Sequence, residues 1–179
     1  MNPTGAPSLT LVLGGMRSGK SRHAERLARE SGLEPVYLAT ARALDAEMAA
    51  RIAAHRRRRG DDWRTVEVPL ALPEAICEES RPGRILLVEC TSMWLNNLLM
   101  AEADLPASFE RFEAALAARR CPVVLVGNEV GFGVVPGDPL SRRFVDHAGA
   151  LHQRLAVLAD RVELVVAGLP LVVKPAPGR

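Results

Sequence analysis

Lysine is almost absent from this 179-residue sequence, in which two lysines stand beside 21 arginines. Aromatic residues make up only 4% of the chain, and the formal net charge is +2. So small an excess of positive charge, with so few side chains for base stacking, argues against a nucleic-acid partner. The cysteines, Cys77, Cys90 and Cys121, are odd in number and lack the paired spacing of a metal site. We therefore expect reduced, mostly buried thiols.

Long hydrophobic runs are missing as well. The longest run near the end, 162–173, is short and contains Glu163, so we expect no membrane-spanning helix. Residues 1–8 lack the basic and apolar segments of a secretory signal. These features favour a cytoplasmic protein, and the length predicts one domain over residues 1–179, with flexible tails at 1–8 and 175–179.

One of the two lysines lies in a glycine-rich motif. An apolar run typical of a buried strand, 9–13, is followed by Gly14-Gly15-Met16-Arg17-Ser18-Gly19-Lys20-Ser21 and then by a helix-compatible segment, 22–29. Strand, glycine-rich turn and helix in this order predict a phosphate-binding P-loop. Its backbone N–H groups would bind the phosphates of a nucleoside triphosphate, and Lys20 would reach the β- and γ-phosphates. The Ser21 hydroxyl would be a ligand of Mg²⁺.

Apolar strands and amphipathic helices alternate along the rest of the chain. Strands are expected at 35–39, 63–68, 85–89, 122–126, 161–166 and 169–173, and helices at 45–59, 72–79, 91–101, 106–119 and 141–159. The continuous apolar strands predict an α/β fold with a mostly parallel sheet that helices cover on both faces. The last two strands predict a hairpin, which would add an antiparallel edge strand.

Glu89 ends one of these apolar strands. The Walker-B acid of P-loop proteins holds this position and binds Mg²⁺ directly or through water. The alternative is a carboxylate that caps the helix expected from Thr91. Because a P-loop is present, we favour the metal role.

A histidine lies on the apolar face of the expected helix 45–59. Met48, Ile52 and His55 share this face, and Arg56-Arg57-Arg58-Arg59 follows directly. Neighbouring positive charge favours the neutral, nucleophilic imidazole and would stabilise negative charge on an attacked phosphate. The alternative is a core histidine, beside arginines that form a solvated face or bind a phosphate-rich partner such as RNA. Four consecutive arginines cannot all face one ligand, so we expect at least one in solvent.

Further motifs lie at 14–25, 37–41, 45–52 with His55, 63–67, 87–90, 96–99 and 128–136. Together, and in register from about residue 11 to 174, they resemble the bifunctional adenosylcobinamide kinases and adenosylcobinamide-phosphate guanylyltransferases of cobalamin assembly. Members of this family phosphorylate the aminopropanol hydroxyl of adenosylcobinamide with ATP or GTP. They then transfer GMP from GTP to adenosylcobinamide phosphate through a GMP–histidine intermediate, and the resemblance implies that this histidine is His55.

The resemblance also implies a RecA-like sheet and a homotrimer. The nucleotide contacts that it implies outside the P-loop are Ala39, Thr40, Ala41, Arg56, Arg57, Arg58, Arg59, Glu67 and Glu89. Relatives often have a second histidine directly before the nucleophile, where this chain has Ala54. The proton partner of the guanylyl step is therefore open.

Two other functions are compatible with the residues alone. One is a kinase of another small alcohol or nucleotide, in which His55 is structural. The other is a non-enzymatic GTP-sensing protein that uses the arginine patch. For the kinase step Glu129 is a candidate base, with a structural loop role as the alternative. We further hypothesise that the helix carrying His55 moves toward the P-loop when GTP binds, with Gly60 and 40–44 as hinges.

Overall fold

A computed structural model describes residues 7–43, 45–60 and 62–176, and the side chains of Arg51 and Arg58 also lie outside this description. The strands are β1 (Leu9–Gly14), β2 (Glu34–Ala39), β3 (Arg64–Glu67), β4 (Arg84–Glu89), β5 (Val123–Asn128), β6 (Arg161–Val166) and β7 (Leu169–Lys174). The helices are α1 (Lys20–Glu30), α2 (Ala46–Arg59), α3 (Leu72–Glu79), α4 (Thr91–Met100), α5 (Leu105–Ala117) and α6 (Pro139–Leu158).

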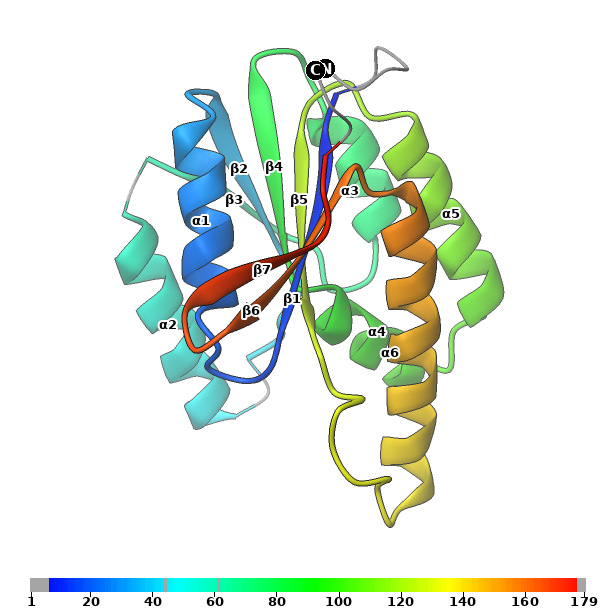
Figure 1. The fold of residues 1–179 in the computed structure, drawn as a ribbon. Helices are drawn as coiled ribbons and strands as arrows, with labels where there is room; N and C mark the ends of the chain where they lie inside the picture. The colour runs from blue at the N-terminus through cyan, green and yellow to red at the C-terminus, as the bar shows by residue number, and fades with distance from the viewer. Residues whose placement is uncertain (1–6, 44, 61, 177–179) are drawn as a thin grey trace.

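The described strands form one seven-stranded sheet in the order β3-β2-β4-β5-β1-β6-β7. All neighbouring pairs are parallel except β6 and β7, which form an antiparallel hairpin at the edge. Helices α1 and α2 lie on one side of the sheet and α3 to α6 on the other (Figure 1). The predicted fold class and the antiparallel edge strand are confirmed.

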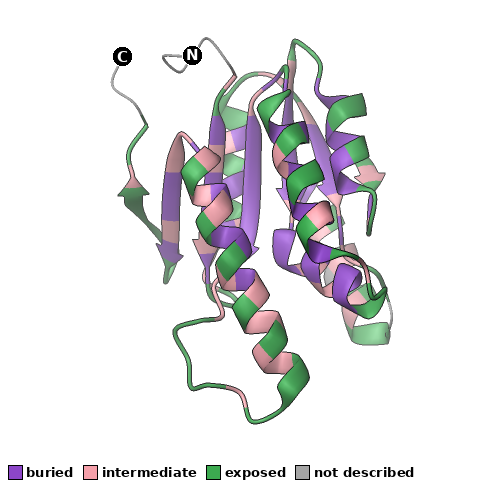
Figure 2. Cartoon of the chain, turned by 90° about the vertical axis from the view of Figure 1, so that its right-hand side faces the viewer, coloured by how far each residue is buried: buried purple, intermediate pink, exposed green. Residues whose placement is uncertain are grey.

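The sheet is apolar on both faces because each face packs against helices. One core lies beneath α3 to α6, where the Trp94 ring packs 4.8 Å from Phe112 between ring centroids and its indole N–H donates to the Leu70 carbonyl at 2.8 Å. The smaller core on the other face includes Val12 and Val126. Figure 2 shows buried residues along the strands and on the inner sides of the helices.

Element boundaries differ from the predictions by one to a few residues. Helix α6 begins at Pro139 rather than 141, because the Asp138 carboxylate accepts a hydrogen bond from the Ser141 N–H at 2.8 Å and caps the helix there. The apolar side of this helix packs on the sheet, with Ala148 and Leu155 fully buried.

The predicted tails fall mostly outside the described residues, at 1–6 and 177–179. Ser8, which we expected in the N-terminal tail, accepts a hydrogen bond from the Val123 N–H at 2.9 Å. Within the described residues, the helices are too short or too polar to cross a bilayer.

The parallel arrangement brings the carboxyl ends of six strands, β1 to β6, to one edge of the sheet. These strand ends are Gly14, Ala39, Glu67, Glu89, Asn128 and Val166. Register places Gly14 beside Asn128 and Ala39 beside both Glu67 and Glu89. Open α/β sheets bind their ligands at this edge, and the predicted site residues gather there.

Candidate active site

The P-loop runs from the end of β1 into the start of α1. Gly19 precedes the helix with φ 95°, and no described side chain caps the helix there. The first N–H groups of α1 are therefore open to an anionic ligand, and the helix dipole favours negative charge at this point. The Lys20 ammonium donates to the Gly15 carbonyl at 3.1 Å, which folds the lysine back over the turn.

Two of the P-loop glycines are required by close packing. A Cβ at Gly14 would lie 2.5 Å from Ser18 Oγ, and one at Gly19 would lie 3.1 Å from Gly168 Cα. At Gly15, by contrast, a Cβ would meet no described atom within 4 Å. The Gly168 N–H donates to the Ser18 carbonyl at 2.8 Å, so the β6–β7 turn braces the P-loop. Local sequence patterns gave no sign of this contact.

Lys20 is 8% exposed. Burial lowers the pKa of its ammonium, while the nearby Cys90 and Glu89 act in the opposite direction. A compact ammonium at the start of α1, held beside a carboxylate, is suited to the negative charge of a bound polyphosphate.

Glu89 lies at the centre of the site. The Ser21 hydroxyl donates a short hydrogen bond to its Oε1, and the Tyr37 hydroxyl donates to its Oε2 at 3.4 Å. Helix α4 is capped instead by Cys90, whose Sγ accepts from the Met93 N–H at 3.4 Å, so Glu89 is not the cap. A hydroxyl and a carboxylate oxygen side by side are the hard donors that Mg²⁺ prefers, and this pair fits the predicted metal role.

His55 projects from α2 toward this carboxylate. Its Nδ1 lies 3.9 Å from Glu89 Oε1, and its side chain is 36% exposed. Glu25 of α1 completes a cluster in which one ligand atom from each of Glu25, His55 and Glu89 lies within 4.8 Å of the others. Glu25 was not among the site residues predicted from the sequence. It lies four residues after Ser21, so both side chains are on one face of α1, and this spacing could have identified Glu25 as a site residue.

The four consecutive arginines diverge. Arg56 and Arg57 are exposed, and the side chain of Arg58 lies outside the described residues. Arg59 is 5% exposed, and its guanidinium carbon lies 3.4 Å from the centroid of the Tyr37 ring. The expectation that at least one arginine faces solvent is confirmed, whereas Arg59 packs in the protein interior as a cation–π partner.

The residues after β2 are held by the protein itself. Thr40 is fully buried, and its hydroxyl donates to the Cys90 carbonyl at 2.8 Å and accepts from the Cys90 N–H at 2.7 Å. The Asn97 amide donates to the Thr40 carbonyl at 2.8 Å. Nucleotide contact by the Thr40 hydroxyl stays a prediction, and these bonds already occupy it. Ala39 and Ala41 are half-buried beside it.

The remaining predicted residues line the rim. Met16 is 76% exposed, Arg17 is exposed with φ 57°, and Glu67 is exposed at the end of β3. The Glu129 N–H donates to the Gly14 carbonyl at 3.0 Å, while its carboxylate accepts from the Gly131 N–H at 2.6 Å. Glu129 therefore lies beside the P-loop, but its carboxylate is engaged within its own loop.

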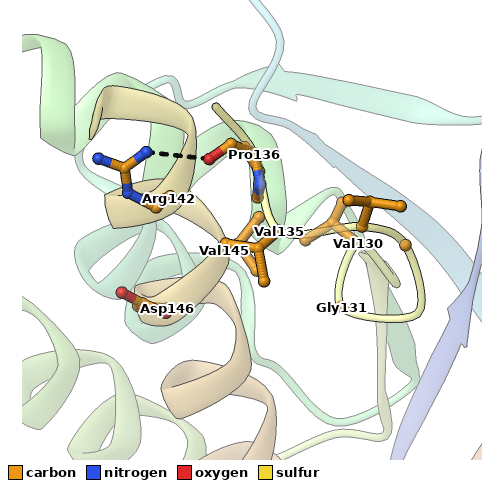
Figure 3. A pocket seen from close by; sticks show the side chains of 9 residues that line it. Val130, Gly131, Val135, Pro136, Arg142, Val145 and Asp146 are labelled. Carbon is orange, nitrogen blue, oxygen red and sulfur yellow. Dashed lines mark hydrogen bonds between the residues drawn. The ribbon is translucent and has the colours of Figure 1, made fainter. Parts of the chain in front are cut away.

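The loop after Glu129 folds over the start of α6. The lining of a small pocket there includes Val130 and Val145, with Arg142 and Asp146 at one side (Figure 3). The Arg142 guanidinium donates to the Pro136 carbonyl at 3.0 Å and closes the loop.

Residues 10–173 match the family described as cobinamide kinase / cobinamide phosphate guanyltransferase. The chain belongs to this family. It is 52% identical over 169 residues to the bifunctional adenosylcobalamin biosynthesis protein CobP of Pseudomonas aeruginosa, covering 93% of this chain and 98% of that protein. It is 44% identical over 181 residues to the bifunctional adenosylcobalamin biosynthesis protein CobU of Escherichia coli, and the match covers 93% of this chain and 99% of that protein. The family resemblance drawn from the motifs is confirmed.

Solved structures give the fold independently. A protein from Pyrococcus horikoshii aligns with a TM-score of 0.57 at 10% identity, over 95% of this chain and 87% of that one. An ATPase from a bacterial type III secretion system aligns with a TM-score of 0.54 at 10% identity. The alignment covers 92% of this chain and 56% of that one. At such low identity these likenesses support the P-loop NTPase fold of the family and nothing finer.

Gly19 is closely packed and Gly15 is in open space, so substitutions at these two P-loop glycines test the packing against each other. We expect Gly19→Ala to destabilise the nucleotide-free protein by about 1–2 kcal/mol, because its φ is positive and Gly168 blocks the new Cβ. Gly15→Ala, with open space around it, should change stability by less than about 0.5 kcal/mol. Urea unfolding monitored by circular dichroism measures both, and equal losses would contradict the assigned packing.

Proposed function

We propose that the chain carries out both reactions of its family at the carboxyl edge of the sheet. A substrate hydroxyl of adenosylcobinamide attacks the γ-phosphate of ATP or GTP, and GMP is then transferred from GTP to adenosylcobinamide phosphate. The observation that carries this proposal is the convergence of the P-loop serine, Ser21, and the histidine of α2, His55, on one carboxylate, Glu89.

In the kinase step, a bond forms between the substrate oxygen and the γ-phosphorus while the bond to the leaving nucleoside diphosphate breaks. The α1 N–H groups and Lys20 stabilise the charge on the phosphate oxygens. Ser21 and Glu89 would hold Mg²⁺, which supplies further neutralisation of the triphosphate when bound. Glu129 stays a candidate for the base that accepts the hydroxyl proton.

In the guanylyl step, an imidazole nitrogen of His55 bonds to the α-phosphorus of GTP and pyrophosphate leaves. A phosphate oxygen of adenosylcobinamide phosphate then attacks the same phosphorus and releases the imidazole. Dividing the transfer in this way lets GMP change acceptor without both large substrates meeting at once. Movement of α2 toward bound GTP, with Gly60 and 40–44 as hinges, stays a prediction, and Leu44 lies outside the described residues.

His55 is the residue that decides between one activity and two. Incubation with Mg²⁺ and GTP labelled at the α-phosphate should leave acid-labile, base-stable label on the native protein. His55→Asn should reduce this label at least 100-fold, since no nucleophile remains, while the matched variant His147→Asn on α6 should keep it. Unlabelled native protein that still phosphorylates cobinamide would favour a plain kinase, and tight GTP binding without turnover would favour a sensor.

Lys20 offers a test of the kinase step. Lys20→Ala should lower phosphorylation of cobinamide by about 10²–10³-fold, because charge stabilisation at the transferring phosphate is lost. Lys20→Arg should fail to restore it, since a planar guanidinium does not replace a compact ammonium between phosphates. Lys174→Arg replaces the other lysine, far from the P-loop, as the control. Transfer of labelled γ-phosphate to cobinamide measures all three variants, and retained activity in Lys20→Ala would exclude the P-loop assignment.

We also infer from the family resemblance a homotrimer that acts in the cytoplasm without nucleic-acid or membrane partners. Strand β7 supports self-association, because it is an edge strand with exposed apolar side chains, among them Leu169 at 69% and Leu171 at 56%. Exposed apolar edges of this kind are typical of contact surfaces.

Light scattering coupled to gel filtration tests the assembly. The native chain should elute as a trimer, and Leu171→Lys should shift it toward the monomer because a buried charge at the contact is costly. Val157→Lys is the control, because Val157 on α6 is 78% exposed. A monomeric native chain would contradict the trimer, and an unaffected Leu171→Lys variant would exclude β7 as the contact.

A further inference from the structure

Glu25 has no role in the reactions as described so far. We propose that Glu25 is a positioning residue for guanylyl transfer: its carboxylate accepts the Nδ1–H of His55, so that Nε2 presents its lone pair to the α-phosphorus. The inference rests on the proposed function, because it concerns the same histidine.

The placement of Glu25 is specific. It lies one turn after Ser21 on α1, and it is 6% exposed although it carries a carboxylate. A carboxylate is seldom buried to this extent unless polar or charged groups surround it. One oxygen of Glu25 falls in the cluster with Glu89 and His55, in which the three ligand atoms lie within 4.8 Å of one another. The helix of the P-loop therefore delivers a second carboxylate to the histidine of α2.

Glu89 cannot serve His55 and the nucleotide equally well. It already accepts from the Ser21 hydroxyl and, at 3.4 Å, from the Tyr37 hydroxyl. The Ser21–Glu89 pair is also the pair suited to a divalent cation, which would draw charge away from the carboxylate. An imidazole 3.9 Å from Glu89 Oε1 then needs another acceptor to fix its tautomer, and Glu25 is the other carboxylate of the cluster.

The chemistry of the histidine defines what this acceptor does. In the neutral ring with hydrogen on Nδ1, the Nε2 lone pair is free to bond to phosphorus. When that bond forms and pyrophosphate leaves, the ring becomes cationic, and the Glu25 carboxylate stabilises the new charge. When the acceptor phosphate displaces the imidazole, the electron pair returns to Nε2. The Nδ1 proton stays in place throughout, so no second histidine is needed at Ala54.

The tautomer of His55 can be measured directly, and it would not change if Glu25 had only a structural role. In protein labelled with ¹⁵N-histidine, the resonances of His55 are identified by their loss in His55→Asn. The native protein should show mainly the form protonated at Nδ1. Glu25→Ala should shift His55 toward the other tautomer. Glu25→Gln, which keeps the shape and an accepting oxygen, should retain the native form.

The kinetic test separates the two reactions. Glu25→Ala should lower single-turnover labelling from α-labelled GTP by about 10²-fold, within the range of general acid–base and positioning effects. Glu25→Gln should recover part of that loss, and cobinamide phosphorylation should change by less than about 3-fold in both. Glu30→Ala is the matched control, because Glu30 is an exposed carboxylate of the same helix, paired with Arg26 at 2.9 Å.

Three results would overturn the inference: a parallel loss of both activities in Glu25→Gln, labelling at the native rate in Glu25→Ala, or an unchanged His55 tautomer in Glu25→Ala. The first would assign Glu25 to the metal or to the fold. If Glu25→Ala does not fold, the isosteric Glu25→Gln variant still separates the two activities. Absence of label on the native protein would instead refute guanylyl transfer through His55, a result independent of any Glu25 variant.

Discussion

The hydrogen bond from the Ser21 hydroxyl to the Glu89 carboxylate is the contact on which the site depends. It ties the first turn of α1 to the end of β4, two segments that are 68 residues apart in the chain. Because β4 neighbours both β2 and β5, this bond fixes the P-loop relative to the carboxyl edge of the sheet. His55 reaches the same carboxylate from α2. Each reaction of a cobinamide kinase that is also a guanylyltransferase consumes its own nucleoside triphosphate, and a carboxylate shared by the P-loop and His55 would serve both.

Features written in short stretches of sequence could be predicted. The P-loop octet and the carboxylate at the end of β4 each depend on a few consecutive residues, and the structure has both. The continuous apolar strands likewise predicted a parallel sheet, because two covered faces require apolar side chains in succession.

Contacts between distant segments could not be predicted in the same way. Nothing in the local pattern around Glu25 says that α2 will lie opposite it. The same holds for Arg59, which was read with its three neighbours as a charged run. It packs against the Tyr37 ring because α2 ends beside β2, and the aromatic face compensates part of the cost of burying the charge. Helix periodicity gives the face of a residue, and only the tertiary fold gives its neighbour.

The β6–β7 turn connects the P-loop to the edge of the sheet. Gly168 both contacts Gly19 and donates to the Ser18 carbonyl at 2.8 Å. The strand that leaves this turn, β7, is the exposed apolar edge. A single short turn therefore joins the exposed edge strand to the backbone of the P-loop. A residue outside the P-loop motif therefore limits which side chain the P-loop can carry at Gly19.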